Sequence, residues 1–133
     1  MATPGPHISP VIRYRDAAAA LDWLEQAFGF ERVADYRDDD GKVAHAELRY
    51  GSGMVMIGEA REDGMGPPPG SGWNYVVVED ADAHHARARE AGAEIVSGLS
   101  DQEYGSRDYS ARDPEGNIWS FGTYQPTLEP SEG

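Results

Sequence analysis

The chain has 133 residues, a length that favours a single domain with its own hydrophobic core. It contains no cysteine, which excludes a disulfide framework, a thiolate nucleophile and a cysteine-based zinc site. Its 24 acidic and 11 basic residues give a net charge of -13, which repels the phosphates of nucleic acids, favours solubility and would attract a cationic ligand. The mean hydropathy is -0.63, no apolar run approaches the roughly 20 residues of a membrane span, and the first residues do not resemble a signal peptide. We therefore expect a cytoplasmic protein without nucleic-acid or membrane partners.

The first half of the chain is predicted to form a strand, a helix and three further strands. The first strand, at residues 7–14, contains Pro10, which lacks an N–H, so this strand lies at a sheet edge or is broken there. Asp16 is a good N-cap, and apolar residues then recur with helical spacing until Gly29. An Asp-Gly turn at residues 38–41 joins two of the strands that follow. These later strands are predicted at residues 31–37, 42–50 and 54–59.

The second half repeats this order after a linker at residues 60–72, where three consecutive prolines lie among glycines. Asp80 is predicted to cap the second helix, which ends at Gly92. Strands are predicted at residues 73–79, 93–97, 107–112 and 118–124, with a loop at 99–106 and a turn at 113–117. The sequence thus predicts one α+β domain, residues 1–133. Its two βαβββ modules, residues 7–59 and 73–125, form a curled sheet with a cleft, and the helices lie on the outer face.

Four segments of the chain are similar to a known family: RYRDAAAALDWLEQAFGFE, HAELRYG, VVVEDADAHHARAREAGAEI and RDPEGNIWSFGTY. Over residues 7–125 the chain resembles the vicinal oxygen chelate superfamily, which includes glyoxalase I, extradiol dioxygenases and the bleomycin-resistance binding proteins. The resemblance implies that the two modules form a cleft, usually completed by a homodimer or by exchange of modules between chains. In metalloenzyme members, four His, Gln or Glu side chains that face the cleft hold a divalent ion.

This chain lacks such side chains at the positions to which the resemblance carries the metal ligands. The positions are Ser9, Ile57 (with Met56 as the alternative register), Trp73 and Ser120. Hydroxyls, an aliphatic group and an indole cannot replace imidazole and carboxylate around a divalent ion. We therefore expect neither a metal nor another cofactor at this site.

The strand at residues 42–50 supplies the most reactive candidates. Its alternation places His45 and Glu47 on the cleft face, about 6.6 Å apart along the strand. His45 could act as a general base oriented by Glu47, whereas two ligands alone would hold a metal weakly. The same alternation groups Val43 and Arg49 with His45 and Glu47, and Ala44, Ala46 and Leu48 on the opposite, apolar face.

Extending the alternation to the other strands gives a mixed aromatic and polar cleft, a combination typical of ligand pockets. The candidate ligand-binding residues are Ser9, Arg13, His45, Glu47, Ile57, Trp73, Tyr75, Asp108 and Ser120.

The sequence favours a metal-independent binding protein that sequesters a small aromatic or cationic compound, such as an antibiotic, in the manner of the bleomycin-resistance proteins. Missing metal ligands and an indole in a metal position support it, although Trp73 could equally fill space. The alternative is a glyoxalase-like lyase or isomerase, with or without a metal, in which His45 is the general base. A third hypothesis is an interaction protein whose cleft is vestigial. In each case a homodimer is expected from the resemblance.

Overall fold

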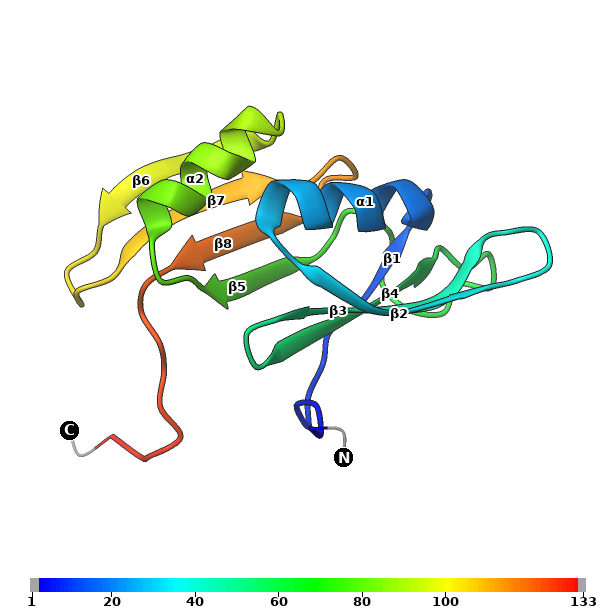
Figure 1. The fold of residues 1–133 in the computed structure, drawn as a ribbon, viewed down its shortest axis with the longest axis horizontal. Helices are drawn as coiled ribbons and strands as arrows, with labels where there is room; N and C mark the ends of the chain where they lie inside the picture. Colours follow the sequence, from blue (N-terminus) through cyan, green and yellow to red (C-terminus); the bar gives the residue numbers. More distant parts are fainter. Residues whose placement is uncertain (1–2, 132–133) are drawn as a thin grey trace.

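The computed structural model describes residues 3–131 and contains two four-stranded sheets with one helix on each (Figure 1). The strand orders are β1-β4-β3-β2 and β5-β8-β7-β6, so the α+β prediction of two βαβββ modules is confirmed. The first module consists of β1 (Val11–Tyr14), α1 (Ala17–Phe28), β2 (Glu31–Arg37), β3 (Val43–Tyr50) and β4 (Gly53–Glu59). The second consists of β5 (Trp73–Val77), α2 (Ala81–Glu90), β6 (Glu94–Asp101), β7 (Arg107–Arg112) and β8 (Ile118–Gly122).

The two modules have the same topology. In each sheet the first strand pairs in parallel with the last strand of its module, and the remaining pairs are antiparallel. As a result β1 and β5 are both edge strands. The edge position predicted for the strand that contains Pro10 is therefore confirmed.

Both helices begin where the sequence predicts. The Asp16 carboxylate accepts a hydrogen bond from the Ala19 N–H at 3.1 Å, and the Asp80 carboxylate accepts one from the Ala83 N–H at 3.0 Å. These bonds satisfy N–H groups that have no partner inside the helix. Helix α1 ends at Gly29, whose φ of 80° is left-handed as a C-cap glycine requires. No helix within residues 3–131 has the length and apolar character needed to cross a bilayer.

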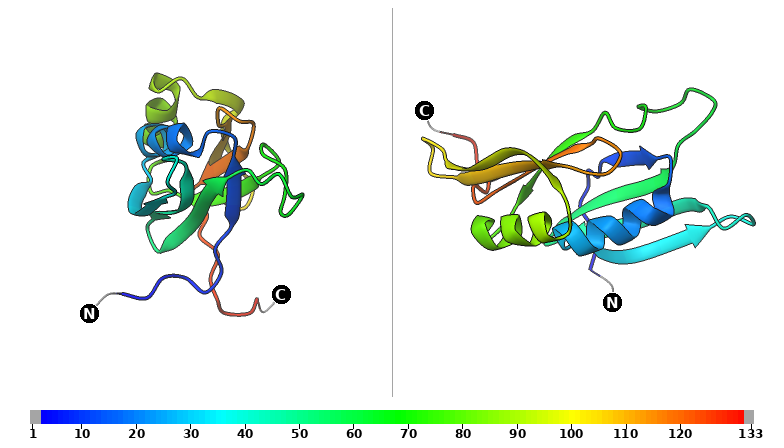
Figure 2. Two further views of the ribbon diagram at one scale, coloured as in Figure 1. Left: turned by 90° about the vertical axis from the view of Figure 1, so that its right-hand side faces the viewer. Right: turned by 90° about the horizontal axis from the view of Figure 1, so that it is seen from above.

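The core lies between the sheets and the helices, which are side by side on one face of the molecule (Figures 1 and 2). The Phe28 ring at the end of α1 is fully buried and lies 4.7 Å from the Phe121 ring and 6.0 Å from the Trp119 ring, measured between centroids. Because Phe121 and Trp119 belong to β8, these contacts join the two modules. One face of each sheet is thus covered by the core, and the other, here called its open face, lies away from the helices.

Two strand boundaries differ from the prediction. Strand β1 begins at Val11 rather than at residue 7, because Pro10 has no N–H to donate; its carbonyl still accepts the Met56 N–H at 2.9 Å. Strand β6 continues to Asp101, through residues predicted to be a loop, because pairing with β7 resumes at Ser100 after two irregularities. Gly98 and the polar residues around it conceal this edge strand in the sequence.

The alternation predicted for the start of β3 is also wrong. Val43 is buried in the core and Ala44 is exposed, the reverse of the expectation. The cause is a register shift between β2 and β3, where Tyr36 pairs with His45 but the next residue, Arg37, pairs with Val43. This bulge leaves Ala44 without a partner and turns Val43 toward the helices.

Candidate functional site

On the open face of the first sheet, His45 and Glu47 form a hydrogen-bonded pair. The distance from His45 Nε2 to Glu47 Oε2 is 2.8 Å, and the two side chains are 41% and 29% exposed. The Tyr36 ring from β2 stacks on the imidazole, 6.3 Å away at an interplanar angle of 16°. Because a carboxylate only accepts, Nε2 carries the shared proton and Nδ1 of the neutral ring is left as an acceptor. The pair is therefore built as an imidazole oriented by a carboxylate.

Arg13 lies on the same open face, on β1. Its register partner on β4 is Gly58, and a β-carbon at Gly58 would collide with the Arg13 guanidinium. Because Gly58 has no side chain, the Arg13 guanidinium can lie over β4 at this position. Within residues 3–131 this half-buried guanidinium has no carboxylate within ion-pairing distance. Its charge is available to a ligand.

On the open face of the second sheet, Trp73 is 70% exposed although its indole is fixed. The indole Nε1–H donates to Ser120 Oγ at 2.9 Å, and Ser120 Oγ lies 2.7 Å from Ser110 Oγ on β7. The alternation predicted for β8 is correct, since Ser120 is on this face while its neighbours Trp119 and Phe121 are fully buried. A large aromatic surface is therefore presented to solvent in a defined orientation.

Tyr75 and Asp108 lie further along this face, above Gly122. A β-carbon at Gly122 would meet both the Asp108 carboxylate and the Tyr75 hydroxyl, so the glycine makes room for them. The Tyr75 hydroxyl donates to the Tyr124 carbonyl at 2.7 Å, and burial raises the pKa of Tyr75. Gly58 and Gly122 occupy the same position in the two modules, each on the last strand, and each admits a polar side chain to the open face.

Two of the predicted site residues are placed differently. Ile57 is 1% exposed in the core, facing the helices, and the alternative register at Met56 is the one that pairs with Val11 on the open face. Ser9 precedes β1 and is half-buried. A hydroxyl, a thioether or alkyl group, an indole and a second hydroxyl do not fit a divalent ion. Within residues 3–131 no group of three His, Cys, Asp or Glu side chains lies close enough together to hold a metal.

The structure distributes these predicted residues over the open faces of both sheets. Arg13, His45 and Glu47 lie on the first sheet, and Trp73, Tyr75, Asp108 and Ser120 lie on the second. No hydrogen bond or ion pair between these two sets is present in the described part of the chain. Sequence periodicity identifies the face of a strand, but the angle between two sheets depends on packing that it does not encode.

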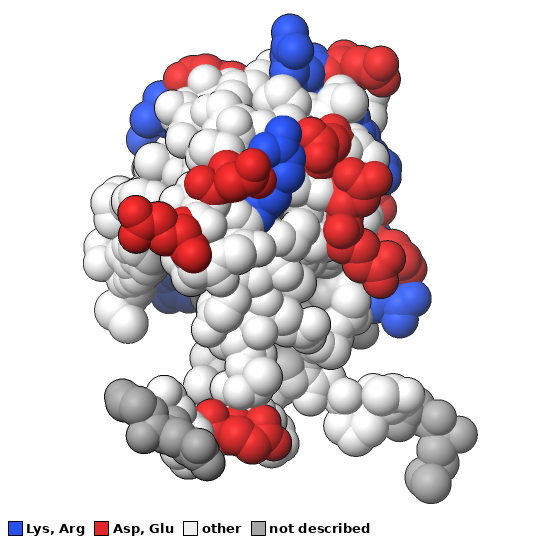
Figure 3. Space-filling model, turned by 90° about the vertical axis from the view of Figure 1, so that its left-hand side faces the viewer, with Lys and Arg blue, Asp and Glu red and all other residues white. Residues whose placement is uncertain are grey.

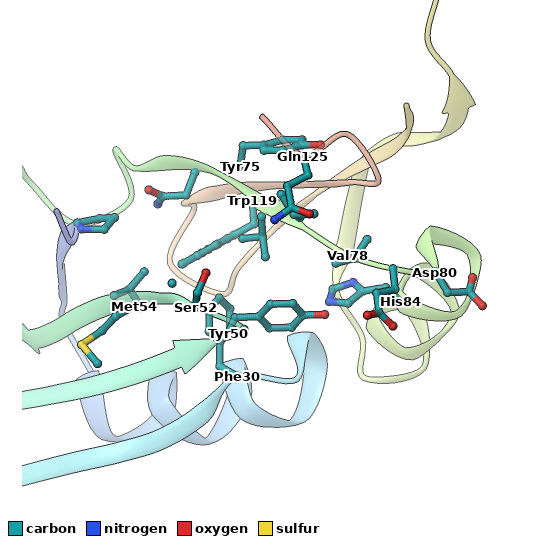
Figure 4. A pocket seen from close by; sticks show the side chains of 18 of the residues that line it. Phe30, Tyr50, Ser52, Met54, Tyr75, Val78, Asp80, His84, Trp119 and Gln125 are labelled. Atoms are coloured by element: carbon teal, nitrogen blue, oxygen red, sulfur yellow. The ribbon is translucent and has the colours of Figure 1, made fainter. Parts of the chain in front are cut away.

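A cavity of about 790 Å³ lies elsewhere, in the groove between the two modules (Figure 4). Tyr50 from the first module and His84 from the second approach each other there, with ring centroids 6.1 Å apart. Tyr75 is the one predicted site residue that lines the groove. The volume suits a small ligand. Both nitrogens of His84 are nevertheless occupied, by the Phe28 carbonyl at 2.9 Å and the Tyr109 hydroxyl at 2.5 Å, so this imidazole is held as part of the structure.

Several relatives are similar in sequence to this chain over nearly its whole length. The uncharacterised protein Rv0887c of Mycobacterium tuberculosis is 35% identical over 132 residues, covering 93% of this chain and 76% of that protein. The uncharacterised protein Mb0911c of Mycobacterium bovis is also 35% identical, covering 93% of this chain and 86% of that protein.

Solved structures share the fold. TioX from Micromonospora sp. ML1 is 36% identical with a TM-score of 0.76, over 89% of this chain and 98% of that chain. TnmS3 from Streptomyces sp. CB03234, an antibiotic binding protein, has a TM-score of 0.70 at 21% identity, over 90% of this chain and 97% of that chain. A model of the Glyoxalase/Bleomycin resistance protein/Dioxygenase superfamily matches residues 6–121, and this chain belongs to that superfamily.

Proposed function

We propose that this protein is a metal-independent binding protein of the cytoplasm that sequesters a small aromatic or cationic compound, such as an antibiotic. The observation that carries the proposal is the Trp73 indole, which is fixed by its bond to Ser120 yet 70% exposed. An exposed aromatic surface in a fixed orientation binds planar molecules by stacking, and the face of an indole attracts cations. The shared fold of TnmS3, an antibiotic binding protein, supports a binding role.

A binding protein needs affinity for its ligand but catalyses no reaction. The side chains at the four positions where metalloenzyme members hold an ion are unsuited to a metal, and this does not weaken the proposed function. Where relatives would place metal ligands, this chain has Trp73 hydrogen-bonded to Ser120. This contact joins β5 to β8, and each of these strands carries one of the positions that hold metal ligands in the metalloenzyme relatives. We infer that this pair replaces coordination of an ion by direct contact with an organic ligand.

The proposal includes a homodimer, because the open face of a single chain leaves apolar groups in water. Val11 on β1 is 47% exposed, and Trp73 and Tyr75 on β5 are 70% and 42% exposed. Both strands lie at sheet edges, where a second copy can approach. In a dimer the open faces of two copies would enclose the ligand from both sides.

Fluorescence titration tests the proposal. Bleomycin and daunorubicin, one a cationic glycopeptide and the other an aminated planar ring system, are titrated into the protein while tryptophan emission is recorded. We expect saturable quenching that Trp73→Phe removes. Trp23→Phe is the matched control, because Trp23 packs against Phe28 on the helix side and its replacement should leave the quenching in place. Absence of saturable quenching with both compounds, or quenching that survives Trp73→Phe, would contradict the proposal.

A glyoxalase-like lyase or isomerase is the second candidate, and the His45–Glu47 hydrogen bond of 2.8 Å is the observation in its favour. An imidazole held by a carboxylate can remove a proton from a carbon next to a carbonyl. The test substrate is the hemithioacetal of methylglyoxal and glutathione, assayed with and without added Zn²⁺ or Ni²⁺. Turnover that His45→Gln abolishes and His85→Gln, on helix α2, retains would favour this candidate, and absence of turnover under all conditions would remove it.

A further inference from the structure

Three tyrosines and a proline line a separate pocket at one end of the second sheet. The β6–β7 turn and the segment after β8 meet at this end (Figure 1). The pocket has a volume of about 460 Å³ and is lined by Tyr75, Tyr104, Tyr124 and Pro126. The Tyr104 and Tyr124 ring centroids are 5.5 Å apart at an interplanar angle of 84°. Two aromatic walls thus meet nearly at a right angle.

Hydrogen bonds hold the hydroxyls of Tyr75 and Tyr104 and the backbone of Tyr124 in place before any ligand arrives. The buried Ser106 hydroxyl accepts the Tyr124 N–H at 3.0 Å and donates to the Asp108 carboxylate. Tyr104 donates its hydroxyl to the same carboxylate at 3.0 Å, while Tyr75 donates to the Tyr124 carbonyl at 2.7 Å. All three tyrosines therefore connect to one network centred on Ser106 and Asp108. Preorganised walls lose little conformational freedom when a ligand binds.

The electrostatics of this pocket favour a cation. The faces of aromatic rings attract positive charge, and the Asp108 carboxylate lies directly behind the Tyr104 hydroxyl. That hydrogen bond raises the pKa of Tyr104, and burial raises the pKa of Tyr75, so both phenols stay neutral at physiological pH. No Lys or Arg lines the pocket; at this end of the molecule both acidic and basic side chains lie around uncharged surface (Figure 3).

We propose that this tyrosine cage (Tyr75, Tyr104 and Tyr124) binds a methylated ammonium group of an organic ligand. N-methyl groups contact aromatic faces well, and a quaternary nitrogen gives up less hydration than a primary ammonium does. The inference deepens the proposed function, since Tyr75 lies two residues from Trp73 on the same face of β5. A ligand held by its ammonium group in the cage would extend its aromatic part toward the Trp73 indole.

The test is a titration of the full chain with choline, followed by the amide signals of ¹⁵N-labelled protein in NMR spectra. The neutral isostere 3,3-dimethyl-1-butanol has the same shape without the charge. We expect choline to shift signals of the cage residues saturably, and the isostere to bind about tenfold more weakly. Equal binding of the two compounds would show a merely apolar pocket. Absence of any saturable shift at choline concentrations up to roughly 50 mM would also overturn the proposal.

Variants locate the choline site. Tyr104→Leu removes one wall and should abolish saturable binding, while Asp108→Asn keeps the shape and should weaken binding roughly three- to tenfold. Tyr36→Leu is the matched control, because Tyr36 and Tyr104 are each 63% exposed but Tyr36 lies on the other sheet. Choline binding that Tyr104→Leu leaves intact, in a variant with the wild-type spectrum elsewhere, would place the cation outside the cage.

Failure of this inference can be told apart from failure of the proposed function. Choline has no ring to stack on Trp73, and Tyr104→Leu, which leaves the Trp73 indole in place, separates choline held by the cage from choline on the exposed indole. Trp73 quenching by aromatic compounds without choline binding would refute the cage and leave the binding function in place. Choline binding without Trp73 quenching by the aromatic compounds would retain the cage and contradict the Trp73 site.

Discussion

The His84 imidazole on α2 is held by hydrogen bonds to two other elements, α1 and β7. Its Nε2 must carry the proton, because its partner, the Phe28 carbonyl at the end of α1, can only accept. Its Nδ1 accordingly accepts the Tyr109 hydroxyl from β7. Protonation of the ring would therefore reverse the hydrogen bond to the Tyr109 hydroxyl and place a charge among the Phe28, Tyr50 and Phe121 rings.

This arrangement predicts a pH-dependent stability. Burial lowers the pKa of His84 below its ordinary value of about 6.5, so the unfolded chain binds this proton first as the pH falls. The contribution of His84 is thus complete above pH 6.5 and is lost progressively below it. In urea unfolding, wild type should be less stable at pH 5.5 than at pH 7.5, and His84→Gln should show a smaller difference. His85→Gln, one residue along α2, serves as control and should behave as wild type; an unchanged difference in His84→Gln would contradict the prediction.

For single residues, the sequence indicates which side chains are important. It is less informative about which other residues surround them in the fold. Helical spacing places His84 on one face of α2 with Ala81 and Ala88, and all three are buried. The hydrogen-bond partner of His84, Phe28, lies 56 residues away, beyond the reach of any periodicity. The cage residue Tyr104 was also missed, since it lies in a segment predicted to be a loop. The only sequence signal there is the aromatic residue itself, flanked by glycine.

Two hairpin turns, one per module, have the same internal hydrogen bonds but should contribute differently to the free energy of unfolding. In each turn an Asp carboxylate accepts the N–H groups two and four residues ahead, from Asp38 in the first module and from Asp113 in the second. Asp38 is exposed, whereas Asp113 is 4% exposed. Asp113 Oδ2 also accepts the Tyr14 hydroxyl at 2.6 Å and the Trp119 indole N–H at 3.1 Å. The second turn therefore ties β1 of the first module to β8.

This comparison predicts unequal costs for the same substitution. Asp38→Ala loses only turn contacts and should cost about 1 kcal/mol. Asp113→Ala also leaves buried donors on Tyr14 and Trp119 without a partner and should cost about 3–5 kcal/mol. Urea unfolding followed by far-ultraviolet circular dichroism measures both. Equal losses for the two variants would show that Asp113 acts only within its own turn.

Element by element, the sequence predicts most of the structure because its signals there are local. The helix caps at Asp16 and Asp80, the Asp-Gly turn and the alternation in β8 each depend on neighbours a few residues apart. The failures at Val43 and β6 both arise from bulges. A bulge depends on the partner strand, so alternation within one strand cannot reveal it.

At the scale of the whole molecule, duplication explains why the two open faces resemble each other and yet differ chemically. Gly58 and Gly122 are equivalent, but the first admits the cation of Arg13 and the second the anion of Asp108. In the proposed dimer these groups would lie on faces that enclose one ligand. The packing of one module on the other cannot be predicted from the sequence pattern, because it is set by contacts between distant residues such as Phe28 and Phe121.

Sedimentation equilibrium tests the dimer directly. Burial of the exposed apolar groups on β1 and β5 should yield a dimer at micromolar concentration. Val11→Lys places a charge on the β1 edge and should shift the equilibrium toward the monomer, whereas Leu128→Lys, at a fully exposed position in the C-terminal segment, should not. A monomer for the wild-type chain at about 100 μM would contradict the assembly proposed here.

The indole N–H signals of the three tryptophans provide the most direct test of where a ligand binds. Trp73 lies on the open face, Trp119 is fully buried and lines the groove between the modules, and Trp23 packs against α1's own Phe28. A titration of ¹⁵N-labelled protein with an aromatic compound that binds therefore reports all three locations in one spectrum. We predict that the Trp73 signal moves and saturates while those of Trp23 and Trp119 stay in place. Movement of Trp119 with Trp73 unchanged would place the ligand in the groove and contradict the proposed site.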